Sequence, residues 1–163
     1  MYFLKIKVSM NFGKKAHIVS TLSFFVTALT FSPIAHSAET IEVWKSPTCG
    51  CCKKWVSHLE KNGFSVITHN TKKMQSIKDD FGVPKKLRSC HTAKIGQYVI
   101  EGHVPASDIN ELLKTNPKDV KVLSAPGMPA GSPGMEMGKR FDPYPTVTYN
   151  TNKEFTLFNY HSE

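Results

Sequence analysis

The spacing of hydrophobic and polar residues predicts a mixed α/β domain. Residues 41–45 alternate apolar and polar side chains, the pattern of a strand with one buried face. A segment with apolar residues at helical spacing follows and closes at Asn62-Gly63, a helix stop signal. In chain order the expected elements are a strand at 41–45, a helix over about 49–62, a strand at 64–69, a helix at 74–81, the two strands of a hairpin at 92–95 and 98–101, and a helix over about 106–116.

This element order, β-α-β-α-β-β-α, is that of the thioredoxin and glutaredoxin fold. In that fold a cysteine motif begins the first helix at the carboxyl end of the first strand. The segment Cys49-Gly-Cys-Cys52 stands at the equivalent place in this chain. We therefore predict an α/β domain of the thioredoxin-like class.

The composition changes beyond the third predicted helix. Residues 124–145 are rich in glycine, proline and methionine and predict a long irregular loop. A loop of this length inside a compact domain is usually functional or disordered. Residues 146–149 and 155–160 predict the strands of a final hairpin, whose aromatic side chains we expect to pack on the domain. The C-terminal extension is thus a Met/Gly/Pro-rich loop followed by a β-hairpin over 146–160.

Residues 1–37 predict a secretory signal peptide. Lys14 and Lys15 precede an apolar run at 18–31, and the small residues of Ala35-His-Ser-Ala38 follow it. The run is short for a membrane-spanning helix and lacks a basic flank after it, so cleavage is favoured over a retained anchor. No Arg-Arg pair precedes the run, which favours export of an unfolded chain. We predict a mature domain over 38–163 in the periplasm, without a stable membrane anchor.

The charge balance gives no sign of a nucleic-acid partner. The chain has 21 basic and 13 acidic residues and a formal net charge of +8. The predicted signal peptide holds four of the basic residues and none of the acidic ones, which leaves about +4 on the mature chain. This excess is spread in short pairs such as Lys72-Lys73 and Lys85-Lys86, as on an ordinary solvated surface. We expect no nucleic-acid binding.

Three of the four cysteines, Cys49, Cys51 and Cys52, fall within four positions, and the fourth is Cys90. If the first helix begins near Cys49, its free N–H groups and positive end favour the thiolate form of these three residues. A purely structural disulfide framework fits poorly, because neighbouring cysteines close only very short loops. The cluster therefore predicts redox chemistry or metal binding.

The redox interpretation depends on Cys49 and Cys52, which form a Cys-x-x-Cys motif. Cys51 between them could trap a mixed disulfide, which argues against a simple thiol–disulfide oxidoreductase. Thioredoxin-like enzymes also place a cis-proline before the third strand, where this chain has Ser89-Cys90-His91. On that fold Cys90 would face the other three thiols, so we expect four sulfur atoms to converge.

Four converging thiolates suit soft metal ions. Cys51 and Cys52 are neighbours on a helix with side chains about 100° apart, so both would bind one tetrahedral zinc ion only with strain. A thiolate can bridge two soft ions, and Cu(I) prefers thiolate and thioether ligands. Iron–sulfur clusters also use four thiolates but are normally assembled before export. We rank copper above zinc, and zinc above iron–sulfur.

Further candidate ligands lie outside the cysteine cluster. Met128, Met135 and Met137 occur in the loop without helical or strand periodicity, and are either apolar contacts of the loop or thioether ligands for copper. His91, next to Cys90, and His103, ahead of the third helix, are weaker candidates, because a lone histidine more often has a structural role. The same structural role is assigned to the other histidines of the mature chain, His58, His69 and His161.

A set of motifs covers nearly the whole mature chain: Thr48–Trp55, Gly82–Pro84, Ser89–Thr92, Tyr98–Ala106, Ala125–Pro129 and Gly131–Met135. Together they resemble the CopG-like family of periplasmic copper-resistance proteins, over about residues 40–160. The resemblance implies a thioredoxin-like fold that holds several copper ions through bridging thiolates. It also implies a role in interconverting Cu(I) and Cu(II). The residues that match the copper-binding motif of the family are Cys49, Cys51, Cys52 and Cys90.

We predict a periplasmic copper-binding protein for copper resistance that holds more than one Cu(I) ion in a thiolate-bridged cluster. Its expected partners are copper ions and other periplasmic copper-handling proteins. The alternative from another class is a thiol–disulfide oxidoreductase that uses Cys49 and Cys52. Storage, redox turnover as a copper oxidoreductase, and transfer of copper to another protein all fit the same residues, and the sequence leaves them open.

Overall fold

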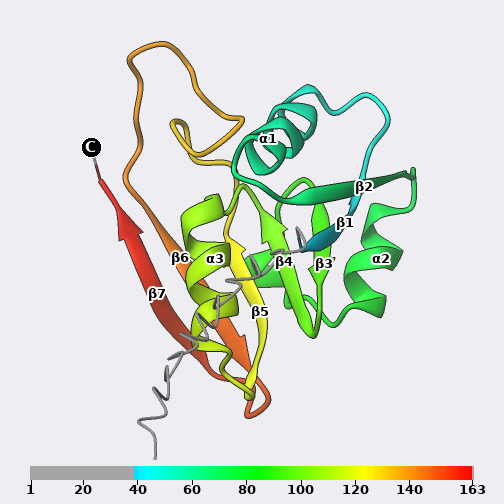
Figure 1. The fold of residues 1–163 in the computed structure, drawn as a ribbon, viewed down its shortest axis with the longest axis vertical. Coiled ribbons are helices and arrows are strands. Elements are labelled where there is room, and N and C mark those ends of the chain that lie inside the picture. Colours follow the sequence, from blue (N-terminus) through cyan, green and yellow to red (C-terminus); the bar gives the residue numbers. More distant parts are fainter. Residues whose placement is uncertain (1–38, 163) are drawn as a thin grey trace, which may run out of the picture. The chain divides into compact units, whose positions relative to one another are not determined.

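The structure is a computed structural model that describes residues 39–162. The predicted signal peptide and its cleavage site lie outside these residues. The described chain forms one mixed seven-stranded sheet and three α-helices (Figure 1). In chain order the elements are β1 Thr40–Lys45, α1 Gly50–Lys61, β2 Ser65–Asn70, α2 Met74–Asp80, the 3₁₀-helix η1 Lys85–Leu87, β3 Thr92–Ile95, β4 Tyr98–Gly102, α3 Ala106–Thr115, β5 Val120–Ala125, β6 Tyr144–Asn150 and β7 Phe155–His161.

The strand order of the sheet is β2-β1-β3-β4-β5-β6-β7. Strand β1 pairs in parallel with β2 and antiparallel with β3, and β3 and β4 form the predicted hairpin. The seven elements predicted up to the third helix are present in the predicted order, with η1 added between α2 and β3. Strands β6 and β7 form the predicted final hairpin. The α/β class and the order of the elements around the cysteine motif are therefore confirmed.

Strand β5 occupies a segment for which no element was predicted. It pairs in parallel with β4 and antiparallel with β6, and so joins the C-terminal hairpin to the rest of the sheet. Because Ser124 and Ala125 belong to β5 and Tyr144 begins β6, the predicted loop at 124–145 is too long at both ends. The irregular segment is 126–143, which we call the Met loop.

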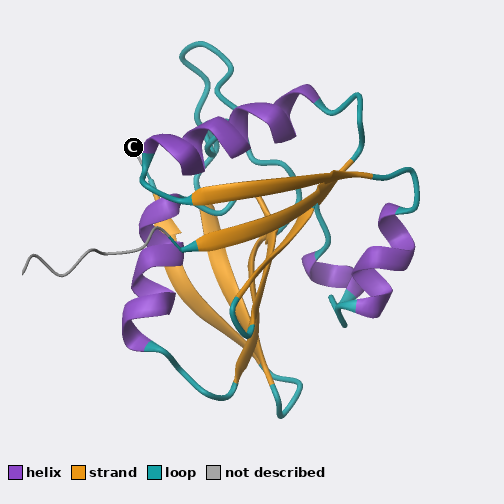
Figure 2. Ribbon diagram, turned by 45° about the vertical axis from the view of Figure 1, so that its right-hand side comes forward, coloured by secondary structure: helices purple, strands orange, loops and turns teal. Residues whose placement is uncertain are grey.

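The two faces of the sheet are covered by different helices (Figure 2). The larger apolar cluster joins α1 and α3 to one face, through residues such as Trp55, Leu59 and Ile109. A smaller cluster on the other face contains Val83 and Leu87, which follow α2 in the chain. Adjacent residues of β4 and β5 alternate between the two clusters, as the pleat of a strand requires. Burial of these side chains is the main stabilising contribution to the fold.

The Met loop packs against the first turns of α1. A side chain at Gly134 would bring its Cβ within 2.7 Å of the Cys51 carbonyl oxygen and 2.8 Å of the Trp55 backbone nitrogen, so only glycine fits this contact. The loop is thereby positioned beside the cysteine motif. Among the helices of residues 39–162, none has the length and apolar character needed to cross a membrane.

Candidate metal centre

The first side of the site is the N-terminus of α1. Cys49 is the N-cap residue, and its Sγ accepts a hydrogen bond from the Cys52 backbone N–H at 3.2 Å. Cys51 Sγ lies 3.4 Å from Cys49 Sγ. The predicted position of the motif at the beginning of the helix is therefore confirmed, and it places the sulfur atoms where backbone N–H groups stabilise negative charge. We call these three residues the helix side of the site.

Cys49 and Cys52 form a disulfide bond in the structure, and Cys51 and Cys90 are free cysteines. The Cys-x-x-Cys pair is thus close enough for redox chemistry without any rearrangement of the backbone. Reduction of this bond takes up two electrons and two protons and produces two thiols. All four sulfur atoms are available as metal ligands only after that reduction, because a metal ligand is a thiolate.

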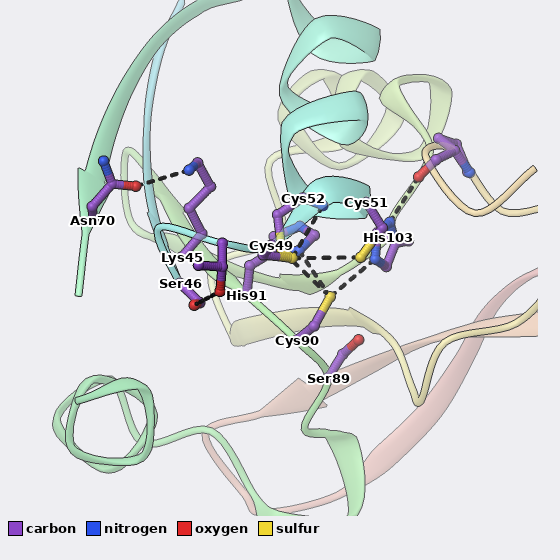
Figure 3. The surroundings of a disulfide bond; sticks show 12 residues. Lys45, Ser46, Cys49, Cys51, Cys52, Asn70, Ser89, Cys90, His91 and His103 are labelled. Atoms are coloured by element: carbon purple, nitrogen blue, oxygen red, sulfur yellow. Dashed lines mark hydrogen bonds between the residues drawn. A yellow bond between two sulfur atoms is a disulfide. The ribbon is translucent and has the colours of Figure 1, made fainter. Parts of the chain in front are cut away.

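The second side of the site comes from the segment before β3 and from the end of β4. Cys90 Sγ lies 3.7 Å from Cys52 Sγ, and the four cysteine sulfur atoms all lie within 4.8 Å of one another (Figure 3). The predicted convergence of Cys90 with the three other cysteines is therefore what the structure shows. Such a set of sulfur atoms is able to bind metal.

Two histidines extend this second side. His103 Nε2 lies 3.0 Å from Cys90 Sγ, and His91 Nδ1 lies 3.4 Å from the same sulfur. Together the three residues form a second group of donor atoms within 4.8 Å of one another. We call Cys90, His91 and His103 the strand side of the site. Both candidate histidines therefore lie at the cysteine cluster.

The tautomer of His103 follows from its hydrogen bonds. Its Nδ1 lies 2.8 Å from the carbonyl oxygen of Pro133 in the Met loop, which can only accept, so Nδ1 carries the proton. The unprotonated Nε2 then faces Cys90, whose thiol donates to it. A histidine oriented in this way is the usual arrangement of a metal ligand, with the second ring nitrogen held by a carbonyl.

Burial keeps the strand side neutral in the metal-free protein. Desolvation raises the pKa of the Cys90 thiol to about 12, and the neighbouring Cys51 adds to the shift. Desolvation also lowers the pKa of His103, and lowers that of His91 well below its ordinary value, with His103 and Lys78 as further causes for His91. The ring of His91 is completely buried, and its Nε2 has no hydrogen-bond partner among the described residues. A metal ion must therefore displace the thiol proton of Cys90 when it binds.

The three candidate methionines lie in different surroundings. Met128 lines a cavity of about 370 Å³ together with Cys90, Ser89 and Arg88. Met137 is 56% exposed and forms an isolated backbone bridge with Arg140. Met135 is partly buried, and its backbone N–H bonds to the Ser132 carbonyl. Of the three, Met128 is the one that shares a cavity with a cysteine of the site.

The remaining histidines have structural partners, as predicted. His58 Nε2 accepts a hydrogen bond from the Ala106 backbone N–H, at the beginning of α3. His69 lies 2.9 Å from a carboxylate oxygen of Glu42 on β1. His161 lies 2.9 Å from Asp108, which is buried.

A buried ionic network behind Cys90 has no counterpart in the sequence-based predictions. Glu101 is completely buried, and its carboxylate oxygens lie 2.6 Å from Lys78 Nζ and 2.7 Å from Thr92 Oγ1. Lys78 is 1% exposed and lies 2.9 Å from Thr92 Oγ1. The available signal was a glutamate inside the apolar strand Tyr98–Gly102, since a charged residue in a buried strand requires a partner.

The donor set fits copper by its chemistry. Thiolate is the preferred ligand of Cu(I), imidazole also suits copper, and the described site offers four sulfur atoms with two imidazoles beside them. A hard cation such as Mg²⁺ or Ca²⁺ would require oxygen ligands instead. The residues of the site therefore favour a soft or borderline metal ion.

Comparisons with known proteins agree with this geometry. Residues 87–135 match the family model described as "Protein of unknown function, DUF411". Two solved structures, "Copper resistance protein copG- Form 2" and "Copper resistance protein copG- Form 1", are both 41% identical in sequence to this chain. The matches cover 77% of this chain and 99% of those chains, with TM-scores of 0.73 and 0.72. No curated protein sequence matches. At this identity and coverage, the chain belongs to the CopG family of copper resistance proteins.

Proposed function

We propose that the protein is a periplasmic copper-binding protein for copper resistance. It holds more than one Cu(I) ion in a cluster bridged by the thiolates of Cys49, Cys51, Cys52 and Cys90. The observation that supports this proposal most strongly is the convergence of all four sulfur atoms within 4.8 Å. Membership of the CopG family gives it independent support.

Several ions fit this arrangement better than one. Cys51 and Cys52 are adjacent on the first turn of α1 and point in directions about 100° apart, which strains chelation of a single ion. Bridging thiolates place each sulfur between two ions and relieve that constraint. Imidazole ligands from His91 and His103 and thioether ligands from the Met loop belong to the same proposal. We also assign the fold to the thioredoxin-like class, which the strand order β2-β1-β3-β4 supports.

The second candidate function is thiol–disulfide exchange, because Cys49 and Cys52 are disulfide-bonded at the N-terminus of a helix. A redox role on copper combines the two functions. Oxidation of the Cys49–Cys52 dithiol to the disulfide releases two protons and two electrons, and each electron would reduce one Cu(II) ion to Cu(I). Two copper ions per disulfide would balance this exchange.

The test of the copper cluster is a titration of fully reduced protein with Cu(I) under anaerobic conditions. We expect more than one ion per chain, and a lower number when Cys51→Ser or Cys90→Ser removes a bridging thiolate. Loss of a group that only hydrogen-bonds to a metal ligand typically lowers affinity about 10–100-fold. The affinity for Cu(I) should fall by more than this, because these variants lose a ligand itself. Binding of no more than one ion, or a stoichiometry that both variants leave unchanged, contradicts the cluster.

The same variants separate the two candidate functions. An oxidoreductase that uses Cys49 and Cys52 should reduce insulin disulfides equally well in the wild type and in Cys51→Ser, and should bind only stray copper. A copper-cluster protein should lose copper in Cys51→Ser, whatever its activity on insulin.

The periplasmic location belongs to the proposal and depends on the predicted signal peptide at 1–37. Expression of the full chain in a Gram-negative host, followed by mass spectrometry of the periplasmic fraction, measures the mature N-terminus. We expect cleavage after Ser37 or Ala38. Retention of the full chain in the cytoplasmic fraction contradicts this assignment.

A further inference from the structure

The carboxylate of Glu101 holds the chain on both sides of the Cys90–His91 dipeptide. Its Oε1 accepts the backbone N–H of Ser89 at 2.6 Å, and its Oε2 accepts the hydroxyl of Thr92 at 2.7 Å. One buried carboxylate therefore contacts the residue before the dipeptide and the residue after it. These contacts fix the place where the chain leaves η1 and enters β3.

Lys78 of α2 completes this arrangement. Its Nζ donates to Glu101 at 2.6 Å and to Thr92 Oγ1 at 2.9 Å, and both charged side chains are at most 1% exposed. Hydrogen bonds among these side chains thus connect α2, β3 and β4 next to the segment that contains Cys90. We call Lys78, Thr92 and Glu101 the buried triad.

Stability alone does not explain such a triad. Removing two charges from water carries a large desolvation cost, and apolar replacements of buried ion pairs are often neutral or stabilising. Three well-packed apolar residues would fill the same space without this cost. What apolar residues would not provide is an acceptor for the Ser89 N–H, which is the group next to Cys90.

We propose that Glu101 is a positioning residue for the metal centre. Its hydrogen bonds to Ser89 and Thr92 hold the sulfur of Cys90 toward the three cysteines of α1, and Lys78 neutralises the charge that this requires. The inference deepens the proposed copper site and rests on it. Glu101 acts through Ser89 and contacts none of the sulfur atoms in the hydrogen bonds described.

The test uses two variants that both remove the ion pair. Lys78→Met/Thr92→Val/Glu101→Leu replaces the triad by apolar residues of similar size, so the core stays filled and thermal stability should fall only by the cost of the unpaired Ser89 N–H. Lys78→Met/Glu101→Gln keeps an amide oxygen that accepts from Ser89 and an amide N–H₂ that donates to Thr92. The first variant loses the positioning hydrogen bonds, and the second retains them.

The measurements are Cu(I) affinity by anaerobic competition and the amide hydrogen exchange of Ser89 in the metal-free protein. We expect the apolar variant to bind Cu(I) about tenfold or more weakly, the range found when groups that orient metal ligands are lost. Its Ser89 amide should exchange at least about tenfold faster, because a charge-assisted hydrogen bond is gone. The glutamine variant should stay within about threefold of the wild type in affinity.

Two results overturn the proposal. One is an apolar variant that matches the wild type in both measurements. The other is a glutamine variant that loses as much affinity as the apolar one, which would make the charges rather than the hydrogen bonds responsible. Failure of the proposed function is recognised separately, because the wild type itself would then fail to bind several copper ions. In that case the exchange of the Ser89 amide still measures whether Glu101 holds this segment.

A second pair of variants applies if the apolar variant does not fold. Ser89→Pro removes the same N–H donor and places its ring Cδ against Glu101 Oε1, so the contact is lost while the three residues of the buried triad are unchanged in sequence; Ser89→Ala keeps the donor. Arg88, the preceding residue, has the extended backbone that a following proline requires. We expect about tenfold weaker Cu(I) binding in Ser89→Pro than in Ser89→Ala, and equal affinities overturn the proposal.

Discussion

The two sides of the site are built in different ways. The helix side consists of Cys49, Cys51 and Cys52 within four positions of one chain segment, and its geometry follows from the first turn of α1. The strand side, with Cys90 at its centre, depends on contacts with α2, β4 and the Met loop. A local motif persists whenever its helix forms, whereas the strand side exists only when distant segments pack correctly. We therefore expect mutations away from the cysteines to damage the strand side first.

The largest effect is expected at Gly102, at the end of β4. Gly102 has φ +75°, and a Cβ there would lie 2.5 Å from Ser89 Cβ and 2.8 Å from the Ala125 carbonyl oxygen. Gly102→Ala should lower the free energy of unfolding by about 4 kcal/mol, because backbone strain and overpacking add. Chemical denaturation measures this change.

The matched control is Gly96→Ala in the turn between β3 and β4. Gly96 has φ +53°, and no atom lies within 4 Å of a Cβ built on it. Only the backbone strain remains there, so we expect a loss of about 1 kcal/mol. If the two variants lose the same free energy of unfolding, the close approach of Gly102 to the Cys90 segment does not contribute to stability. A larger loss of copper affinity in Gly102→Ala would place the damage on the strand side.

The same division explains what the sequence could predict. The position of the cysteine motif at the N-terminus of α1 follows from local signals, namely the preceding strand and the helical spacing after Cys49. The facing position of Cys90 could be predicted only by comparing the order of the elements with that of the thioredoxin-like class. Both predictions were confirmed. The sequence was therefore sufficient to predict the site residues whose positions depend on local spacing or on the order of the elements.

Features that depend on tertiary contacts were not predicted. Strand β5 carries the short pattern Val122-Leu123 between polar neighbours, which is too brief to separate from a loop without its partners β4 and β6. The partnership of Lys78 with Glu101 joins residues 23 positions apart, and no spacing rule links them. Both features belong to long-range packing, the part of folding that local periodicity does not encode.

An intermediate effect is expected from pH, and it arises on the strand side. Burial lowers the pKa of both His91 and His103, so each takes up a proton at lower pH in the folded, metal-free protein than in the unfolded chain. In the unfolded chain a histidine takes up a proton near pH 6.5, so below this pH the unfolded state binds more protons. The free energy of unfolding should therefore fall as the pH is lowered from 7 to 5, by at most about 1.4 kcal/mol per pH unit for each of the two histidines, with the steepest fall below pH 6.5.

The control for this pH dependence is His103→Gln, which removes one of the titrating groups. Its slope of unfolding free energy against pH between 6.5 and 5 should be smaller than that of the wild type by up to about 1.4 kcal/mol per unit. His58, whose pKa is also lowered by burial, remains in the variant and keeps part of the slope. An unchanged slope would mean that His103 takes up a proton in the folded protein as readily as in the unfolded chain, contrary to the lowering of its pKa by burial.

The smallest effect is expected in the Met loop, where two methionines can be compared directly. Met128 and Met137 are both 56% exposed, so a change of either to leucine should leave thermal stability nearly unaltered. Among the cavities described, Met128 is the methionine that shares one with Cys90, which makes its thioether the better candidate donor for copper. Met128→Leu should therefore weaken Cu(I) retention by about threefold to tenfold, and Met137→Leu should leave it unchanged.

A triple change of Met128, Met135 and Met137 to leucine sets the upper limit of this loop effect. If the triple variant loses no more copper than Met128→Leu alone, the other two methionines serve only the packing of the loop. If all variants retain copper like the wild type in anaerobic competition with a chelator, the loop contributes no thioether ligand. The site would then bind copper through cysteine and histidine alone. The Met loop would contribute only the Pro133 carbonyl, which accepts the hydrogen bond from His103, and no sulfur ligand.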